Sequence, residues 1–255
     1  MSHYSDIGFK LTKNEDVIEL FNRINKDESI KRGSWDLNGS DDTIYVMYYF
    51  GEIRYSVELD NVNNYINRIG LGHNNERISK AIYNGKIKVG EETGEFDTLV
   101  IKKDGIPFWF SCPNMGIFHI KEDEHEDLDL KIASFANYLE IIDPVEEETK
   151  VIDEIQEEVR QGKPIDFANE SYVSNFENDP CEGFVSGIIQ GFKLETNPLT
   201  GETYYAIDID CLGLYFKLLV DVNLIEYQEI KVGRVARGVF FNTALLVADN
   251  HPDYF

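Results

Sequence analysis

The sequence predicts an α+β fold in three parts. Two hairpin signals and several capped helical stretches predict an N-terminal antiparallel sheet with helices over residues 1–143. Acid-rich helical spacing predicts a helical connector and linker over residues 144–182. Four β-rich runs separated by turn residues predict a small C-terminal β-barrel over residues 183–255.

The first predicted element is a helix that begins at a capping box. In this box the hydroxyl of Thr12 accepts from a free backbone amide, while Glu15 reaches back to the start of the helix. Apolar residues then recur at helical spacing and form one stripe that can face a core: Val17, Leu20, Phe21 and Ile24.

Turn residues predict two β-hairpins. Residues 43–50 and 53–59 are rich in β-branched and aromatic side chains, and only Gly51 and Glu52 separate them. A glycine at the first central position suits a type II′ turn. The second hairpin spans residues 97–112, and its turn contains Asp104-Gly105.

Helical spacing also predicts three further helices before residue 143. The first covers residues 62–70 and the second covers residues 78–85, and each ends at a glycine, the residue that most often follows a helix. A third apolar stripe runs from Leu130 to Ile142.

Acidic residues are concentrated in one segment. The chain has a net charge of −23, and residues 122–182 hold 20 Asp and Glu against 4 Lys and Arg. Asp143-Pro144 suits a helix start, and the helix that follows is expected to end near Gly162. Such a surface repels nucleic acid and anionic lipid and attracts basic proteins. The predicted protein-binding residues are the acids of this helix: Glu146, Glu147, Glu148, Glu154, Glu157 and Glu158.

Residues 183–248 resemble an OB-like barrel. The resemblance rests on the order of the long β-rich runs, the Thr200-Gly201 turn and the Lys231-Val232-Gly233 sequence before the last run. It implies binding of oligonucleotides or oligosaccharides. Against nucleic acid, Asp208 and Asp210 share a strand face with an aromatic ring, and two carboxylates there repel phosphate. The same two acids could be a glycoside-hydrolysis pair or simply exposed charges.

No stretch carries a complete catalytic or metal-binding motif. Cys112 could be a nucleophile with His73, His119 or His125 as its base and Asp97 as the orienting group, but no spacing links them. The alternative is that Cys112 is a packing thiol. Residues 119–127 are dense in metal-type ligands, yet they lack the glycine and spacing of an EF-hand loop and could equally form a solvated loop. The sequence therefore predicts no metal and no cofactor.

These observations rank binding above catalysis without deciding between them. The chain lacks a 20-residue apolar run and a signal-peptide pattern, so we expect a cytoplasmic protein without membrane contact. The first-ranked function is an acidic, immunity-protein-like module of bacterial type that neutralises or scaffolds a basic protein. The alternatives are an enzyme or small-ligand binder with an interdomain pocket, and oligonucleotide or oligosaccharide binding by the C-terminal part. The sequence leaves the oligomeric state open.

Overall fold

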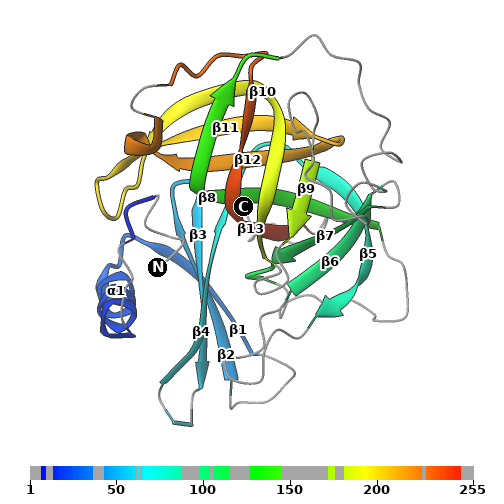
Figure 1. Cartoon of the computed structure of the whole chain (residues 1–255). Coiled ribbons are helices and arrows are strands. Elements are labelled where there is room, and N and C mark those ends of the chain that lie inside the picture. Colours follow the sequence, from blue (N-terminus) through cyan, green and yellow to red (C-terminus); the bar gives the residue numbers. More distant parts are fainter. Residues whose placement is uncertain are drawn as a thin grey trace.

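β-strands account for most of the chain that the structure describes. The computed structural model describes residues 7–9, 14–36, 43–60, 62–63, 65–87, 98–103, 106–114, 127–144, 172–175, 181–225 and 228–247 (Figure 1). Within these ranges the helical elements are α1 (Asn14–Lys26) and η4 (Val222–Ile225), a short 3-10 helix. The predicted α+β class with several helices is therefore wrong, because the protein is mainly β and has two sheets.

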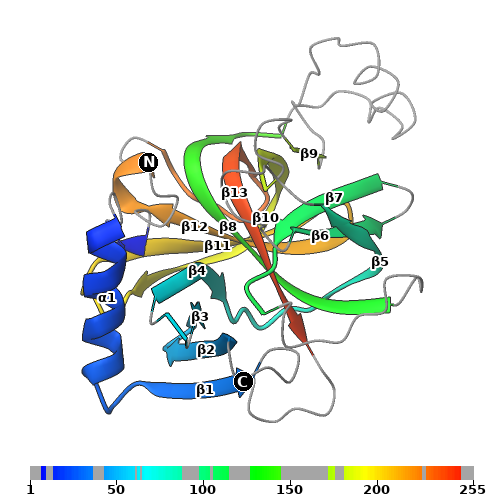
Figure 2. The same ribbon diagram turned by 90° about the horizontal axis from the view of Figure 1, so that it is seen from below.

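The smaller sheet is a four-stranded antiparallel meander. Its strands are β1 (Lys31–Asp36), β2 (Thr43–Phe50), β3 (Ile53–Asp60) and β4 (Tyr65–His73), in that order. The hairpin predicted from residues 43–59 is confirmed as β2 and β3, and Gly51 in its turn has a left-handed φ of 57°. The predicted N-terminal helix is confirmed as α1, which lies beside this sheet and buries Leu20 and Ile24 (Figure 2).

The larger sheet has nine strands. In chain order these are β5 (Ser79–Ile87), β6 (Thr98–Lys103), β7 (Ile106–Ser111), β8 (Asp127–Ile142), β9 (Tyr172–Asn175), β10 (Glu182–Thr196), β11 (Thr203–Cys211), β12 (Leu214–Asp221) and β13 (Val235–Val247). Their hydrogen-bonded order is β11-β12-β8-β5-β6-β7-β13-β10-β9, with further pairings of β11 with β10 and of β8 with β13. The second predicted hairpin is confirmed as β6 and β7.

Five strands of this sheet close into a ring. Each of β8, β12, β11, β10 and β13 pairs with two others of the five, and within the ring only the β8–β12 pair is parallel. The four predicted C-terminal strands are present as β10 to β13. They do not close a barrel by themselves, however, because β8 from residues 127–142 supplies the fifth strand.

The ring is buried on both sides of β8. Ile132 and Ala136 belong to a core that includes residues from all five ring strands and from β5 and β7. Ala133 and Phe135 belong to a second core, which joins the outside of the ring to α1 and the four-stranded sheet. A strand that is buried on both faces has no polar side, so its sequence does not alternate.

Three predicted helices are strands in the structure. Residues 62–70 contribute to β4, residues 78–85 to β5 and residues 130–142 to β8. Each of these strands contains a β-bulge, with Asn67, Asn84 and Asn137 as the respective extra residues. In β4 the bulge lets Ile66 and Ile69, three residues apart, pack against the same core, and this spacing imitates a helix.

Other expectations fall partly outside the described residues. The predicted acidic helix of residues 144–162 lies beyond Pro144, the last described residue of that stretch. In the described part of the chain, no helix has the length and apolar character needed to cross a bilayer.

Candidate functional site

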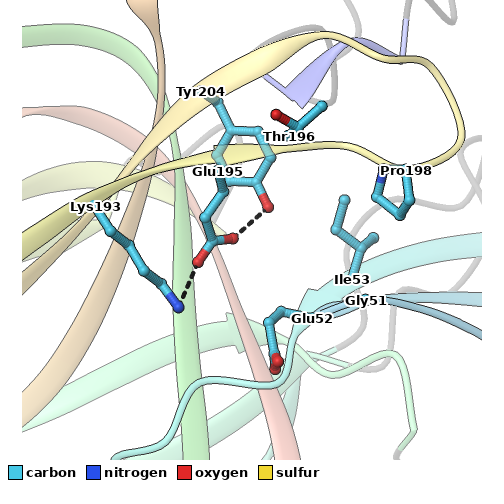
Figure 3. A pocket seen from close by; sticks show the side chains of 8 residues that line it. All are labelled: Gly51, Glu52, Ile53, Lys193, Glu195, Thr196, Pro198 and Tyr204. Atoms are coloured by element: carbon cyan, nitrogen blue, oxygen red, sulfur yellow. Dashed lines mark hydrogen bonds and ion pairs between the residues drawn. The ribbon is translucent and has the colours of Figure 1, made fainter.

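A polar pocket lies between the β2–β3 turn and the β10–β11 hairpin (Figure 3). Its volume is about 340 Å³, near the lower end of the roughly 300–1,000 Å³ typical of ligand pockets. Two carboxylates, one ammonium and one phenol face it together with small and apolar groups. The lining residues are Gly51, Glu52, Ile53, Lys193, Glu195, Thr196, Pro198 and Tyr204.

The β2–β3 turn forms one wall of the pocket and is held through its backbone. The guanidinium of Arg54 donates to the carbonyl oxygens of Gly51 at 2.8 Å and Ile53 at 3.1 Å. The amide of Asn74 donates to the carbonyl oxygen of Glu52 at 2.7 Å. The turn is therefore fixed from both sides, and it presents the exposed side chain of Glu52 at the edge of the pocket.

The connection between β10 and β11 forms the opposite wall and is organised by Asn197. Its buried side chain accepts from the amide of Leu199 at 2.9 Å and donates to the carbonyl oxygen of Ile7 at 2.6 Å. Its own amide donates to the carbonyl oxygen of Glu202 at 2.8 Å. These bonds tie the hairpin end to the N-terminal region and hold Pro198 against the pocket.

Glu195 is the centre of the site. Its Oε2 accepts from the hydroxyl of Tyr204 at 2.6 Å and lies 3.2 Å from Nε2 of His73. Its Oε1 forms an ion pair with Nζ of Lys193 at 2.8 Å, on the pocket side in Figure 3. Lys193 and Glu195 point to the same face of β10 because they are two residues apart. His73 comes from the end of β4, so the cluster joins the two sheets.

The pKa values of the cluster are set by burial and by hydrogen bonds. Burial acts to raise the pKa of Glu195, but donors from His73, Lys193 and Tyr204 outweigh it and hold this pKa well below its usual value. Burial and the bond to Glu195 raise the pKa of Tyr204. Complete burial lowers the pKa of His73, opposed by Glu195. Near neutral pH the site therefore holds an ionised carboxylate, a neutral imidazole and a neutral phenol.

This arrangement suits recognition of charged groups. None of the eight lining residues is a cysteine, serine or histidine, and His73 is only 1% exposed, so it supports Glu195 from behind. Among the described residues, no group of three or more His, Cys, Asp or Glu side chains is placed to hold a metal ion. The pocket offers a fixed carboxylate and a half-exposed lysine.

Of the groups proposed for catalysis from the sequence, the structure describes Cys112 and His73, and the side chain of His73 contacts Glu195. Cys112 is buried, and its Sγ donates to Oδ1 of Asn114 at 3.4 Å. Its proposed partners His119, His125 and Asp97 lie outside the described residues. The other two cysteines, Cys181 and Cys211, are buried thiols, and burial raises the pKa of the Cys211 thiol.

The predicted protein-binding and metal-type residues also lie largely outside the described ranges. This holds for residues 119–126 of the metal-type set and for all six acids of the binding set: Glu146, Glu147, Glu148, Glu154, Glu157 and Glu158.

The charged residues of the C-terminal strands are engaged with one another. Asp208 forms an ion pair with the buried Lys217 at 2.6 Å, and Asp210 caps the following turn by accepting from the amide of Gly213 at 3.0 Å. Two arginines of this region also form ion pairs, Arg234 with Asp143 and Arg237 with Glu140. Four aromatic residues of these strands are core residues: Tyr204, Phe216, Phe240 and Phe241.

Sequence reasoning singled out His73, as a possible base for Cys112, but missed Glu52, Lys193 and Glu195 as site residues. His73 and Glu195 are 122 residues apart, and only the pairing of distant strands joins them. The one local signal was the alternation of Lys193 and Glu195 along β10, which places opposite charges on one face.

Comparison of the chain with protein-family models, with curated proteins and with solved structures finds no match in any of the three. The site therefore has to be interpreted from its own chemistry.

Proposed function

We propose that this chain is a cytoplasmic protein-binding module that recognises a basic protein partner through its acidic segment, as an immunity-like neutraliser or a scaffold. The observation that carries the proposal is the concentration of charge, with 20 Asp and Glu against 4 Lys and Arg in residues 122–182. A field of this kind speeds the approach of a basic partner and disfavours acidic ones.

The positions where the acidic segment joins the fold support a single docking region. Residues 145–171 of this segment connect the end of β8, which is followed by Asp143 and Pro144, to Tyr172 at the start of β9. Tyr172 pairs with Ser186, Ser186 with Arg237, and Arg237 with Glu140 across four adjacent strands. Glu140 and Tyr172 are therefore separated by three strand spacings, or about 14 Å along the sheet. Both ends of the segment are therefore anchored at one end of the ring.

An exposed aromatic side chain lies close to this region. Tyr138 on β8 is 49% exposed, and its hydroxyl bonds to Glu140. Tyrosine is enriched among the residues that dominate binding energy at interfaces. We assign Tyr138 to affinity and the acidic segment to the rate of association.

The test begins with affinity capture from the source cells at low salt and elution at high salt. With the captured partner, reversal of Glu147, Glu154 and Glu158 to Lys should slow association about tenfold at low ionic strength. The effect should shrink as salt screens the charges. The matched control reverses Glu19, Glu28 and Glu229, which are exposed and change the net charge equally. If both triple reversals slow association equally, the acidic segment acts only through the net charge of the protein.

A second candidate is binding of a small ligand in the pocket between the β2–β3 turn and the β10–β11 hairpin. Its two walls come from the parts of the chain that the sequence assigned to different domains, as the alternative of an interdomain pocket requires. Screening of small charged fragments by NMR tests this candidate. Perturbations confined to residues such as Glu52 and Thr196 would support it, and an absence of perturbation there would remove it.

A further inference from the structure

Lys193 occupies a position in the pocket that is arranged for a positive charge. Its Nζ lies 2.8 Å from Oε1 of Glu195, while its side chain is 50% exposed. The hydrogen bond to Glu195 raises the pKa of Lys193, and the nearby charges of Glu52 and Glu76 raise it further. Three carboxylates from separate parts of the chain therefore favour a cation at this point.

We propose that this pocket accepts an arginine or lysine side chain from a protein partner, and that Lys193 occupies the place of this side chain in the free protein. The inference deepens the proposed function and rests on it, because the basic partner supplies the cation. We call the eight-residue lining the cation pocket.

The carboxylate that receives the cation is fixed in advance. Tyr204 and His73 are each 1% exposed and both lie at Oε2 of Glu195. They hold the carboxylate ionised and oriented whether or not Lys193 is present. Displacement of Lys193 thus frees Oε1 for a new donor without rearranging the buried part of the cluster. A site whose receiving group is already in place loses less affinity to ordering on binding.

Displacing Lys193 from Glu195 also requires little free energy. A lysine with a half-exposed stem returns its ammonium to water by rotating its side chain, whereas a buried ion pair resists separation. The nearby buried cations cannot take its place. Arg54 is bonded to the carbonyl oxygens of Gly51 and Ile53, and Lys217 is paired with Asp208 at 2.6 Å.

The walls of the pocket suit the stem of a long cationic side chain. Ile53 and Pro198 contribute apolar groups to the lining, and Glu52 is exposed at its edge within electrostatic reach of Lys193 (Figure 3). An arginine stem packs against such apolar surface while its guanidinium reaches the carboxylates. The planar guanidinium can donate to two carboxylate oxygens at once, an arrangement that an ammonium does not match.

The charge of the lining favours a cation over an anion. The lining residues include two carboxylates and one ammonium. With Lys193 displaced, the lining retains two negative charges, and an anionic ligand would meet both. Removing Lys193 should therefore strengthen the binding of a cationic ligand and weaken the binding of an anionic one.

The test uses the full chain and N-acetyl-arginine amide as the probe, with the backbone amide signals of Glu52 and Thr196 followed by NMR. The Lys193→Gln variant should bind the probe about threefold or more tightly, because a competing cation is removed. Glu52→Gln should weaken binding about threefold, and its exposed position leaves the fold intact. N-acetyl-citrulline amide, the neutral isostere, should not bind.

Two controls make the result decisive. Lys80→Gln removes an equivalent charge from a side chain that is 82% exposed and distant from the pocket lining, and it should leave probe affinity unchanged. An equal gain in Lys80→Gln and Lys193→Gln would show an effect of net charge and overturn the proposal. Weaker binding by Lys193→Gln, or equal binding of the citrulline probe, would also overturn it. Reversal of Glu147, Glu154 and Glu158 should not affect the probe, so failure of the acidic segment and failure of the pocket are separable.

Discussion

At the scale of single residues, the contact between His73 and Glu195 is the most consequential. It joins the end of β4 to β10 with a histidine that is 1% exposed. Burial lowers the pKa of this histidine in the folded state, so the unfolded chain takes up a proton at a higher pH than the folded protein does. Because the pKa of His73 is lower in the folded state, its contribution to stability is lost as pH falls through and below the pKa of the unfolded chain, about 6.5.

We therefore expect the free energy of unfolding to decrease between pH 7.5 and pH 5.5, in part through His73. In the His73→Gln variant, whose amide can still donate to Glu195, this part of the decrease should vanish. Urea unfolding at the two pH values measures the difference. If the variant keeps the full pH dependence of the parent, the titration belongs to other groups.

Glu195 also loses its stabilising contribution as pH falls, but in a different pH window. Its pKa is depressed in the folded state, so its contribution to stability is present above its unfolded value of about 4.3 and is lost as pH falls through the folded value. The two groups are separable because His73 acts at mildly acidic pH and Glu195 only in stronger acid.

At the scale of elements, turn residues explain where sequence reasoning succeeded, and the bulges help to explain where it failed. The β2–β3 and β6–β7 hairpins were predictable because their turns carry glycine and their strands are β-branched or aromatic. β8 was not predictable, because both of its faces are buried and Asn137 shifts the alternation, so Ala136 and Leu139 reach the same core three residues apart. A local pattern cannot separate such a strand from a helix.

The bulge in β8 also dictates a glycine on the neighbouring strand. A Cβ on Gly238 of β13 would lie 1.9 Å from the carbonyl oxygen of Tyr138, so the backbone would have to move. Gly238→Ala should therefore destabilise the protein by about 1–3 kcal/mol, as overpacking does. Gly191→Ala on β10 is the control, because its Cβ would meet only Asp208 Oδ2 at 3.6 Å. Thermal unfolding of both variants checks the prediction, and equal losses would contradict it.

At the scale of the whole molecule, strand pairing joins the parts of the chain on either side of residues 145–171. β8 precedes this stretch and pairs with β12 and β13, which follow it. We expect that a protease site introduced between residues 145 and 171 can be cut without separating the fragments, since the ladder from Val235↔Ile142 to Val247↔Asp129 remains. Size-exclusion chromatography after cleavage measures this. Separate elution in native buffer would instead favour the independent domains predicted from the sequence.

The overall charge leads to a prediction about nucleic acid. With a net charge of −23, and with Arg234 and Arg237 engaged by carboxylates, the chain should show no measurable binding to single- or double-stranded DNA or RNA near physiological salt. Fluorescence anisotropy with labelled oligonucleotides measures it. A salt-sensitive micromolar affinity would instead support the oligonucleotide-binding alternative.

The candidate site could be predicted from the sequence only in fragments. The charge of the acidic segment is a property of composition and is visible at once, whereas the pocket requires the β2–β3 turn to meet the β10–β11 hairpin. That meeting depends on which distant strands pair, and one chain carries no local signal for it. Glu195 is therefore an ordinary strand acid in the sequence and the centre of a cluster in the fold.

Closure of the ring has a further consequence for the newly made chain. β8 is a strand of 16 residues, and it is synthesised well before its ring partners β12 and β13. Until these partners leave the ribosome, long stretches of backbone on β8 lack their ring partners, and such edges readily join the wrong strand. Contacts between residues so distant in sequence also form slowly. The architecture that buries β8 most completely in the finished protein thus makes it the segment most in need of protection during synthesis.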